Sequence, residues 1–412
     1  MKDNQAKYPQ LRFKGFTDPW EERKLSELAT MNARIGWQNL RTSEFLDNGD
    51  YMLITGTDFK AGAIDYSNIH YVEKERFEQD KKIQISNKSI LITKDGTLGK
   101  VAYVEGLTMP ATLNAGVFNV KVKEDLAIDS KYLFHYLKAP FLLKFADQRS
   151  TGGTIKHLNQ NVLVEFPIPL PSLGEQHKIA GLLSNFDNTI ALHQRKLAKL
   201  KELKQGYLQK LFPKNGSKFP QLRFAGFADA WEQRKFGELY KKNLERNKDH
   251  FSSDRTISIA TMRFKKEGNG AAENSLVSYK VLREGDIAFE GHTSKRFAFG
   301  RFVLNDIGDG IMSPRFTTLR PTQDMPIKFW KQYIHYEPIM RYPIVNSTKL
   351  GTMMNELVVD EFLNQPVLVP ELSEQQKIGS FFKQLDNTIA LHQRKLEKLQ
   401  ELKKGYLQKM FC

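Results

Sequence analysis

The sequence is poor in cysteine and has no long apolar run. Its only cysteine is Cys412, the last residue, so neither a disulfide within the chain nor a cysteine-based zinc site can form. No apolar stretch approaches the ~20 residues that a membrane-spanning helix needs. The opening residues, MKDNQAKYPQ, lack the apolar core of a signal peptide. These absences predict a cytoplasmic protein that has no membrane partner.

Recognisable catalytic motifs are also missing. The sequence has no H-E-x-x-H motif and no Asn/Asp-Pro-Pro-aromatic tetrad of the kind that adenine methyltransferases use. Lys94–Val101 (KDGTLGKV) resembles a phosphate-binding loop, but its glycines are only three positions apart and Lys100 precedes valine rather than Ser or Thr. A hairpin turn that presents Lys94, Thr97 and Lys100 fits better. The carboxylates of Asp18–Lys24 (DPWEERK) are too closely spaced for a nuclease site. We therefore predict no catalytic residue, no metal site and no cofactor on this chain.

What the sequence has in excess is positive charge. Its 62 Lys and Arg outnumber its 47 Asp and Glu, which gives a net charge of +15 over 412 residues. Such a charge indicates a polyanionic partner, most simply nucleic acid, although a basic protein without an anionic partner has the same composition. A 40% share of hydrophobic residues is enough for real cores, and the length suggests two or three domains.

Two segments of the chain occur twice. Pro9–Leu28 matches Pro220–Leu239 at 14 of 20 positions, at an offset of 211 residues. Gly174–Phe212 matches Ser373–Phe411 at 26 of 39 positions, at an offset of 199, and both contain the eleven residues DNTIALHQRKL unchanged. The stretches between these matched ends align only loosely. Two long repeats with similar ends and different middles indicate one architecture that carries two specificities.

The longer matched segment is predicted to form a long helix in each copy. It has no internal proline, is rich in good helix formers, and repeats its apolar residues in steps of four and three, as a coiled-coil seam does. Because each helix carries an apolar stripe, we expect the two copies to pair antiparallel, with the variable blocks at opposite ends and a pseudo-twofold axis between them. The seam positions are Ile179, Leu183, Phe186, Ile190, His193, Leu197 and Leu200 in the first copy, and Ile378, Phe382, Leu385, Ile389, His392, Leu396 and Leu399 in the second.

Some polar residues fall on or beside this seam. His193 and His392 are read either as a metal pair or pH switch, or as polar residues that fix the helix register. The lack of a carboxylate or second histidine three or four positions away favours the register role. Lys204 and Lys403 continue the seam and are predicted to extend their ammonium groups into solvent. Asp187 lies off the seam and is left for neighbours or solvent.

The variable blocks are predicted to be mixed α/β with short strands. In the first block, the strand-like stretches 51–59, 89–104 and 114–122 precede a helix pair that is broken near Pro140. The second block repeats this order between residues 284 and 343.

Polar and basic loops are the candidate DNA-binding surfaces of both blocks. Residues 147–160 and 290–301 combine Arg, Lys, Asn, Gln and hydroxyl side chains, which can contact base edges and phosphates. A solvated loop is the alternative for any one of these residues. The candidates are Lys94, Thr97, Lys100, Arg149, Ser150, Thr151, Lys156, His292, Thr293, Ser294, Lys295, Arg296, Arg301, Arg315 and Lys349.

The whole arrangement resembles the specificity subunits of Type I restriction-modification systems. Each variable block closes with the same residues before the long helix: Pro171, Leu173, Glu175, Gln176, Lys178 and Ile179, and then Pro370, Leu372, Glu374, Gln375, Lys377 and Ile378. The strands ILITKDGTLGKVAYV and GDIAFEG are also similar to the recognition domains of that family. The resemblance covers nearly the whole chain.

This resemblance implies an α+β fold with two mixed α/β target recognition domains joined by two long helices, which form an antiparallel coiled coil with pseudo-twofold symmetry. The predicted parts are a first recognition domain at 1–173, a spacer helix at 174–212, a linker with the second recognition domain at 213–372, and a second spacer helix at 373–412.

The resemblance also implies the function. Each recognition domain would read one half of a bipartite, asymmetric double-stranded DNA site, and the helix pair would fix the gap between the halves. Two modification subunits, which use S-adenosylmethionine, would dock on this chain, and restriction subunits, which use ATP and magnesium, would join them. The family has no fixed set of base-reading residues to carry over.

Two other classes of protein stay open. One is a non-enzymatic coiled-coil scaffold with two protein-binding domains, and the other is an enzyme that cuts or modifies DNA by itself. Salt-dependent DNA binding tests the first, and activity of the purified chain tests the second.

Overall fold

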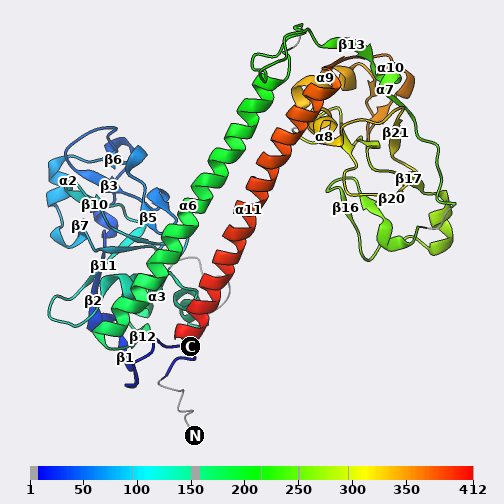
Figure 1. Ribbon diagram of the computed structural model, residues 1–412. Helices are drawn as coiled ribbons and strands as arrows, with labels where there is room; N and C mark the ends of the chain where they lie inside the picture. Colours follow the sequence, from blue (N-terminus) through cyan, green and yellow to red (C-terminus); the bar gives the residue numbers. More distant parts are fainter. Residues whose placement is uncertain are drawn as a thin grey trace. The chain divides into compact units, whose positions relative to one another are not determined.

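The computed structural model describes residues 8–95, 97–149, 158–214, 216–248, 251–295 and 297–411. The chain divides into two compact units. Unit 1 holds Met1–Arg195 with Arg394–Cys412, and unit 2 holds Lys196–Gln393. Each unit therefore contains one variable block and one end of each long helix (Figure 1).

Short strands form the framework of unit 1. They are β1 (Glu21–Lys24), β2 (Ala29–Ala33), β3 (Met52–Ile54), β4 (Phe59–Lys60), β5 (Ala63–Ile64), β6 (His70–Tyr71), β7 (Gln84–Ile85), β8 (Ile90–Thr93), β9 (Val101–Tyr103), β10 (Ala111–Leu113), β11 (Val117–Val122) and β12 (Pro167–Leu170). One sheet has the order β2-β11-β8-β9-β5-β4 and another the order β6-β3-β10-β7, while β1 pairs with β12. The structure places β3, β8, β9 and β11 inside the stretches that the sequence predicted as strands.

Unit 1 has five short α-helices among the described residues. They are α1 (Leu25–Leu28), α2 (Lys74–Glu78), α3 (Ser130–Lys138), α4 (Phe141–Gln148) and α5 (Gln160–Leu163). Of these, α3 and α4 pack on one face of the six-stranded sheet. The Asp129 carboxylate caps α3 by accepting a hydrogen bond from the Tyr132 backbone N–H, and Pro140 separates α3 from α4 as expected. Apolar residues of β8, β11, α3 and α4 form the main core together with Ile179, Leu183 and Met410 from the long helices.

Unit 2 begins with strand, short helix and strand, and ends with helices before a closing strand, as unit 1 does, but the hairpin β22–β23 stands between its helices α9 and α10. Its strands are β13 (Glu232–Lys235), β14 (Tyr240–Lys242), β15 (Ile257–Ser258), β16 (Arg263–Phe264), β17 (Lys280–Leu282), β18 (Ile287–Glu290), β19 (Arg301–Leu304), β20 (Gly310–Met312), β21 (Thr317–Pro321), β22 (Thr348–Lys349), β23 (Glu356–Leu357) and β24 (Pro366–Val369). Its helices are α7 (Phe236–Leu239), α8 (Ile327–His335), α9 (Glu337–Val345) and α10 (Val359–Leu363). The central sheet has the order β14-β21-β18-β19, and β13 pairs with β24 as β1 does with β12.

Two long helices, α6 (Leu173–Leu211) and α11 (Leu372–Phe411), each contribute to both units. In unit 1 the start of α6 lies beside the end of α11, since Phe186 packs against Tyr406 with ring centroids 5.4 Å apart. In unit 2 the end of α6 lies beside the start of α11, where Tyr207 packs against Phe381 at 4.9 Å. The chain directions are opposite in both contacts, so the predicted antiparallel pairing is confirmed, as is the α+β class. Among the described residues, no helix is both long and apolar enough to cross a membrane.

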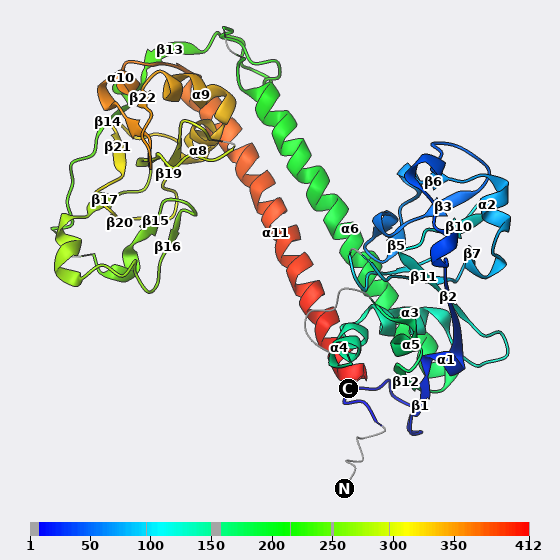
Figure 2. The same cartoon turned by 180° about the vertical axis from the view of Figure 1, so that it is seen from behind.

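The aromatic end of each long helix fills the core of the unit built on the other copy. Phe411 packs edge-on against Trp20 and Tyr136 in unit 1, where α4 lies beside the end of α11 (Figure 2). Phe212 packs against Trp231 and Tyr336 in unit 2. Each core therefore depends on residues from both repeats.

Candidate nucleic-acid interface

The two matched segments of each repeat meet at a buried ion pair. In unit 1 the Arg12 guanidinium donates to both carboxylate oxygens of Glu175, at 3.0 and 2.7 Å, and Trp20 Nε1 donates to the same carboxylate at 3.0 Å. In unit 2 Arg223 makes the same bidentate pair with Glu374, at 2.9 and 2.6 Å. Both glutamates are almost fully buried, so a carboxylate at this place needs its arginine.

Neighbouring residues of the Glu-Gln-x-Lys pattern complete this clamp. Gln176 Nε2 donates to the Pro171 carbonyl at 2.8 Å, and Gln375 Nε2 donates to the Pro370 carbonyl at 2.9 Å. The Lys178 ammonium lies 5.0 Å from the centroid of the Phe16 ring. We call this arrangement, in either unit, the helix-start clamp. It explains why the segments 9–28 and 220–239 are duplicated together with the helices.

The first residue of DNTIALHQRKL is a second junction. In unit 1 the Asp187 carboxylate on α6 accepts hydrogen bonds from Lys403 on α11 and, at 3.2 Å, from Lys138 on α3. In unit 2 the equivalent Asp386 accepts from Lys204 at 2.6 Å and from Gln332 of α8 at 3.0 Å. Each aspartate thus joins its own helix, the other long helix and the recognition domain.

The expectation that Lys204 and Lys403 extend into solvent is wrong. Lys403 keeps only 13% of its side-chain surface exposed. The reason is that an aspartate of the other repeat faces each lysine, and this partner cannot be read from the lysine's own helix.

Burial and charge together set the protonation of this junction. Burial would raise the pKa of Asp187, but Lys138 and Lys403 outweigh it and the net pKa is lowered. His135 lies 3.8 Å from the same carboxylate and 3.0 Å from the Ser184 hydroxyl. Burial lowers the pKa of His135 to about 3, which leaves the imidazole neutral at pH 7.

All fourteen predicted seam residues are buried or half-buried. Ile179, Leu183, Leu197, Ile378, Phe382 and Leu396 are buried, while Phe186, Ile190, His193, Leu200, Leu385, Ile389, His392 and Leu399 are half-buried.

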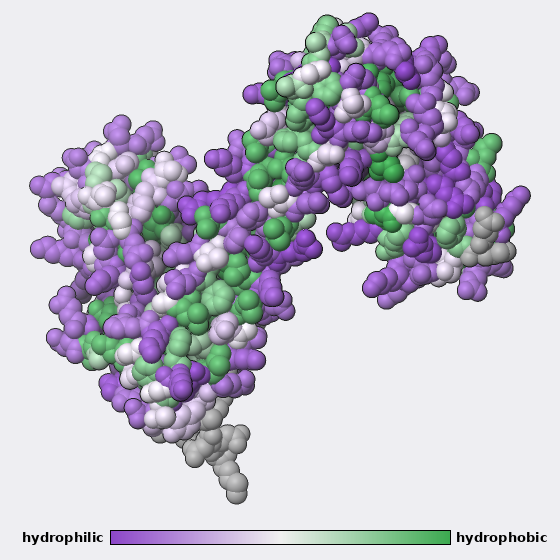
Figure 3. Space-filling view, viewed as in Figure 1, coloured by the Kyte–Doolittle hydropathy of each residue, from purple (hydrophilic) through white to green (hydrophobic). Residues whose placement is uncertain are grey.

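Leucines on another face of the long helices are exposed at equivalent positions of the two copies. Leu192 and Leu391 expose 43% and 44% of their surface, and Leu203 and Leu402 form a second such pair. Apolar surface is visible between hydrophilic side chains along the C-terminal part of α11 in Figure 3. The duplicated sequence therefore fixes an outward surface as well as a seam.

Lys94, Thr97 and Lys100, three of the predicted contact residues of unit 1, lie on the turn between β8 and β9. Thr97 and Lys100 are exposed on this turn, and the Lys94 ammonium lies 5.7 Å from the centroid of the Phe118 ring. The backbone N–H of Leu158 donates to the Lys94 carbonyl at 3.1 Å, which brings the end of the loop 147–160 to the turn. Arg149 stacks on Phe145 at 3.7 Å. Ser150, Thr151 and Lys156 lie outside the described residues.

A basic groove of about 1000 Å³ opens beside this turn in unit 1. Its lining combines Lys100 with cations that the sequence reasoning missed, namely Lys60, Lys131, Lys138, Lys403 and Lys404, and with the carboxylates of Glu105 and Asp187. These lysines come from β4, the β8–β9 turn, α3 and α11, so no linear spacing could have grouped them. Lys60, Lys131, Lys138 and Lys403 form ion pairs with Asp65, Glu105 and Asp187, so carboxylates balance much of the positive charge of the groove.

The predicted contact residues of unit 2 lie mostly on the loop between β18 and β19. His292, Thr293, Ser294 and Lys295 are exposed there, while Arg301 donates to Glu290 at 2.6 Å and is half-buried. Arg296 lies outside the described residues.

Two further candidates lie elsewhere in unit 2. Lys349 is exposed on β22, opposite Glu356 of β23. Arg315 is exposed before β21, and its guanidinium carbon lies 4.7 Å from the centroid of the Phe316 ring.

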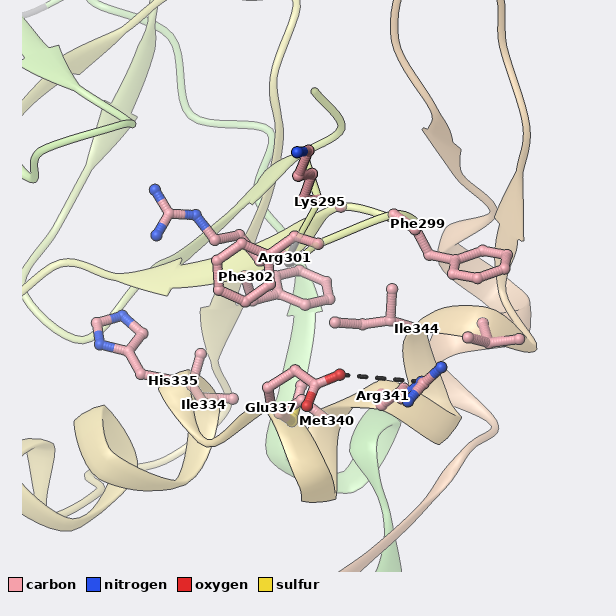
Figure 4. Close-up of a pocket in the computed structure, with 14 residues that line it drawn as sticks. Lys295, Phe299, Arg301, Phe302, Ile334, His335, Glu337, Met340, Arg341 and Ile344 are labelled. Carbon is pink, nitrogen blue, oxygen red and sulfur yellow. Dashed lines mark ion pairs between the residues drawn. The ribbon is translucent and has the colours of Figure 1, made fainter. Parts of the chain in front are cut away.

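The loop between β18 and β19 also lines a pocket of about 410 Å³ in unit 2 (Figure 4). Lys295, Phe299 and Arg301 belong to the loop side of the pocket, and Glu337 and Arg341 come from α9. Glu337 and Arg341 form an ion pair of 3.9 Å.

Comparisons with known proteins cover most of the chain. The family model described as "Type I restriction modification DNA specificity domain" matches residues 17–202 and 228–401. The MjaVIII specificity subunit of Methanocaldococcus jannaschii is 24% identical over 410 residues, which span 93% of this chain and 94% of the relative. The EcoR124I/EcoR124II specificity subunit of Escherichia coli is 27% identical over 146 residues, or 35% of either chain.

Solved structures show the same fold. The crystal structure of a Type I restriction-modification S subunit from M. genitalium superposes with a TM-score of 0.63 at 16% identity, covering 98% of this chain and 99% of that one. A chain from a study of complex assembly and conformational transition of the type I R-M system gives a TM-score of 0.51 at 16% identity, covering 97% and 99%.

Proposed function

The chain belongs to the Type I restriction modification DNA specificity domain family and is a specificity subunit with two target recognition domains. On that premise we propose that each domain reads one half of a bipartite, asymmetric DNA site. The observation that carries this proposal is the contrast inside each unit. Both units share the arginine–glutamate pair of the helix-start clamp and the lysine–aspartate bond between the long helices, while the loops 147–160 and 290–301 differ in sequence. One scaffold therefore presents two different reading surfaces.

DNA binding by the isolated chain tests this reading against a protein-binding scaffold. Because binding to phosphates releases counterions, the affinity for duplex DNA should fall steeply between 50 and 200 mM salt, roughly 10³-fold or more if six or more phosphates are contacted. A chain that binds duplex DNA with no salt dependence, or not at all, contradicts the proposal.

The long helices are proposed to set the gap between the two half-sites. Seven residues inserted into both α6 and α11 keep the heptad register and add about 10 Å of helix, the length of about three base pairs. Mapping of methylated adenine in cells that carry the insertion should show unchanged half-sites and a longer gap. Altered half-sites with an unchanged gap contradict the spacer role.

The exposed leucine pairs are proposed to dock two identical modification subunits. Leu192 and Leu391 are exposed at equivalent positions of the two copies, which suits two identical partners that each contact one copy. We expect Leu192→Asp or Leu391→Asp alone to bind one modification subunit and the double variant to bind none, as measured by native mass spectrometry. Gln209→Asp with Gln408→Asp introduces the same charge at exposed, equivalent positions on another face of the two helices and is the matched control. Loss of both subunits from a single variant contradicts two independent docks.

Catalysis is proposed to lie on the partner subunits. In this scheme the modification subunits bring S-adenosylmethionine, and the restriction subunits bring ATP and magnesium. The purified chain should bind DNA but transfer no methyl group from S-adenosylmethionine until a modification subunit is added. Methyl transfer by the chain alone contradicts this assignment.

A further inference from the structure

A β-hairpin of unit 2 carries an unusually exposed apolar tip. Strands β22 and β23 pair antiparallel, with Thr348 opposite Leu357 and Lys349 opposite Glu356. Between them, Leu350 exposes 71% of its surface and Met353 exposes 91%. Met353 is the most exposed of the large hydrophobic residues among those the structure describes.

The foot of this hairpin is fixed to the core. Leu357 is buried, and the Val358 backbone N–H donates to the Ser347 carbonyl at 2.8 Å. Ser347 is itself fully buried, and its hydroxyl donates to the Pro343 carbonyl at 2.6 Å. The hairpin is therefore an extension of the packed domain.

The tip is fixed as well, through Asn355. This residue is only 3% exposed, and its side-chain amide donates to the Ala298 carbonyl at 3.0 Å. Its backbone N–H donates to the Gly291 carbonyl at 2.9 Å, and its side-chain oxygen accepts from the Gly351 N–H at 3.2 Å. A Cβ placed on Gly291 would come within 2.1 Å of the Asn355 carbonyl oxygen, so the approach requires glycine.

These bonds attach the apolar tip to the loop between β18 and β19, which carries Lys295. The exposed Lys349 stands at the start of the same hairpin. Two segments, joined for example by the bond between Ala298 and Asn355 57 positions apart, thus form one platform, with apolar side chains at its tip and Lys295 and Lys349 on the two segments. Burying the tip against a protein alone would not call for these cations, whereas DNA offers phosphates for the lysines and base faces for the apolar side chains.

We propose that Met353, supported by Leu350, is a wedge that inserts at one base step of the half-site read by unit 2 and unstacks it, while Lys295 and Lys349 hold the flanking phosphates. This inference rests on the proposed DNA-reading function. Apolar side chains inserted between base pairs kink DNA and extend the contact surface. Burial of a methionine side chain corresponds to roughly 10- to 100-fold in affinity.

The test uses the full chain with its modification subunits on duplexes that carry its mapped site, with 2-aminopurine placed at successive steps. The wild type should raise the fluorescence at one step within a single half-site. Met353→Ala should abolish this signal and weaken binding about 10- to 100-fold, while Met353→Leu should retain both. Leu244→Ala removes another strongly exposed leucine of unit 2, outside the hairpin, and should change neither.

The outcomes separate the wedge from the underlying function. Failure of the wild-type complex to bind the duplex overturns the DNA-reading function, and the wedge with it. Tight binding without a fluorescence change, and with Met353→Ala equal to wild type, overturns the wedge alone. A Met353→Ala variant that keeps its DNA affinity but loses a modification subunit shows a protein contact instead, which also overturns the wedge.

Discussion

The aspartate junction of unit 1 offers a quantitative test of how the two repeats are held together. Asp187 receives hydrogen bonds from Lys403 of the other long helix and from Lys138 of the recognition domain. Asp187→Asn keeps the shape of the side chain but removes the charge that both lysines face. The matched change in unit 2 is Asp386→Asn, where Lys204 and the neutral amide of Gln332 are the partners.

The expected costs follow from the partners and their burial. A hydrogen bond between charged groups contributes about 1.5–3 kcal/mol when it is partly buried. Asp187 faces two ammonium groups and keeps 26% of its side-chain surface exposed, so Asp187→Asn should lower the free energy of unfolding by about 3 kcal/mol. Asp386 faces one ammonium group and is 33% exposed, so Asp386→Asn should cost about 1.5 kcal/mol.

A double-mutant cycle with Lys403→Met isolates the contact across the helices. Urea denaturation should give a coupling of about 1.5 kcal/mol between Asp187→Asn and Lys403→Met. Amide hydrogen exchange should rise in α3 for Asp187→Asn and in α8 for Asp386→Asn, because each aspartate holds a different recognition domain. A coupling below about 0.5 kcal/mol, or equal loss of protection in both helices for either variant, refutes the reasoning.

Three more predictions follow from the same contacts. The pKa of His135 is lowered to about 3, so below about pH 6.5 the unfolded chain takes up a proton that the folded chain does not. The stability of unit 1 should therefore fall by about 1 kcal/mol per pH unit between pH 6 and 4, a slope that His135→Gln removes in urea titrations. Arg12→Ala leaves the buried Glu175 carboxylate without its cation and should cost about 3 kcal/mol in the same assay; a cost below 1 kcal/mol argues against the helix-start clamp. Lys100→Ala should lower the slope of log affinity against log salt by about 0.9 in DNA binding, whereas an unchanged slope removes this residue from the phosphate contacts.

Much of the architecture could be predicted because two segments of the sequence occur twice. The offset of 199 residues between the two copies of DNTIALHQRKL, together with heptad spacing, was enough to predict the long helices and their antiparallel pairing. Strand-like stretches with glycine and Asp-Gly at the turns, together with Pro140, likewise predicted β8, β11 and the break between α3 and α4. The heptad spacing and the strand and turn patterns are local features, so each can be read from its own segment without knowledge of the tertiary contacts.

The partners of polar side chains could not be predicted in this way. The heptad spacing places Lys403 on the seam, and from this spacing alone its ammonium group was predicted to reach solvent. In the structure the ammonium group instead bonds the carboxylate of Asp187, 216 positions away in the sequence. The grouping of the groove lysines and the contact of Asn355 with Gly291 could not be predicted either. Their members lie on different elements, and the distance along the chain between them carries no information about their contact.

The sequence by itself determined that this protein has two copies of one plan, which helices join them, and that its charge suits a polyanion. Only the tertiary structure decided which side chains form the joints and which loops form one surface. The physical reason is that hydrophobic periodicity is imposed by each helix or strand separately, whereas a buried ion pair or a stapled loop needs two distant segments to be brought within hydrogen-bonding distance by the packing of the whole unit.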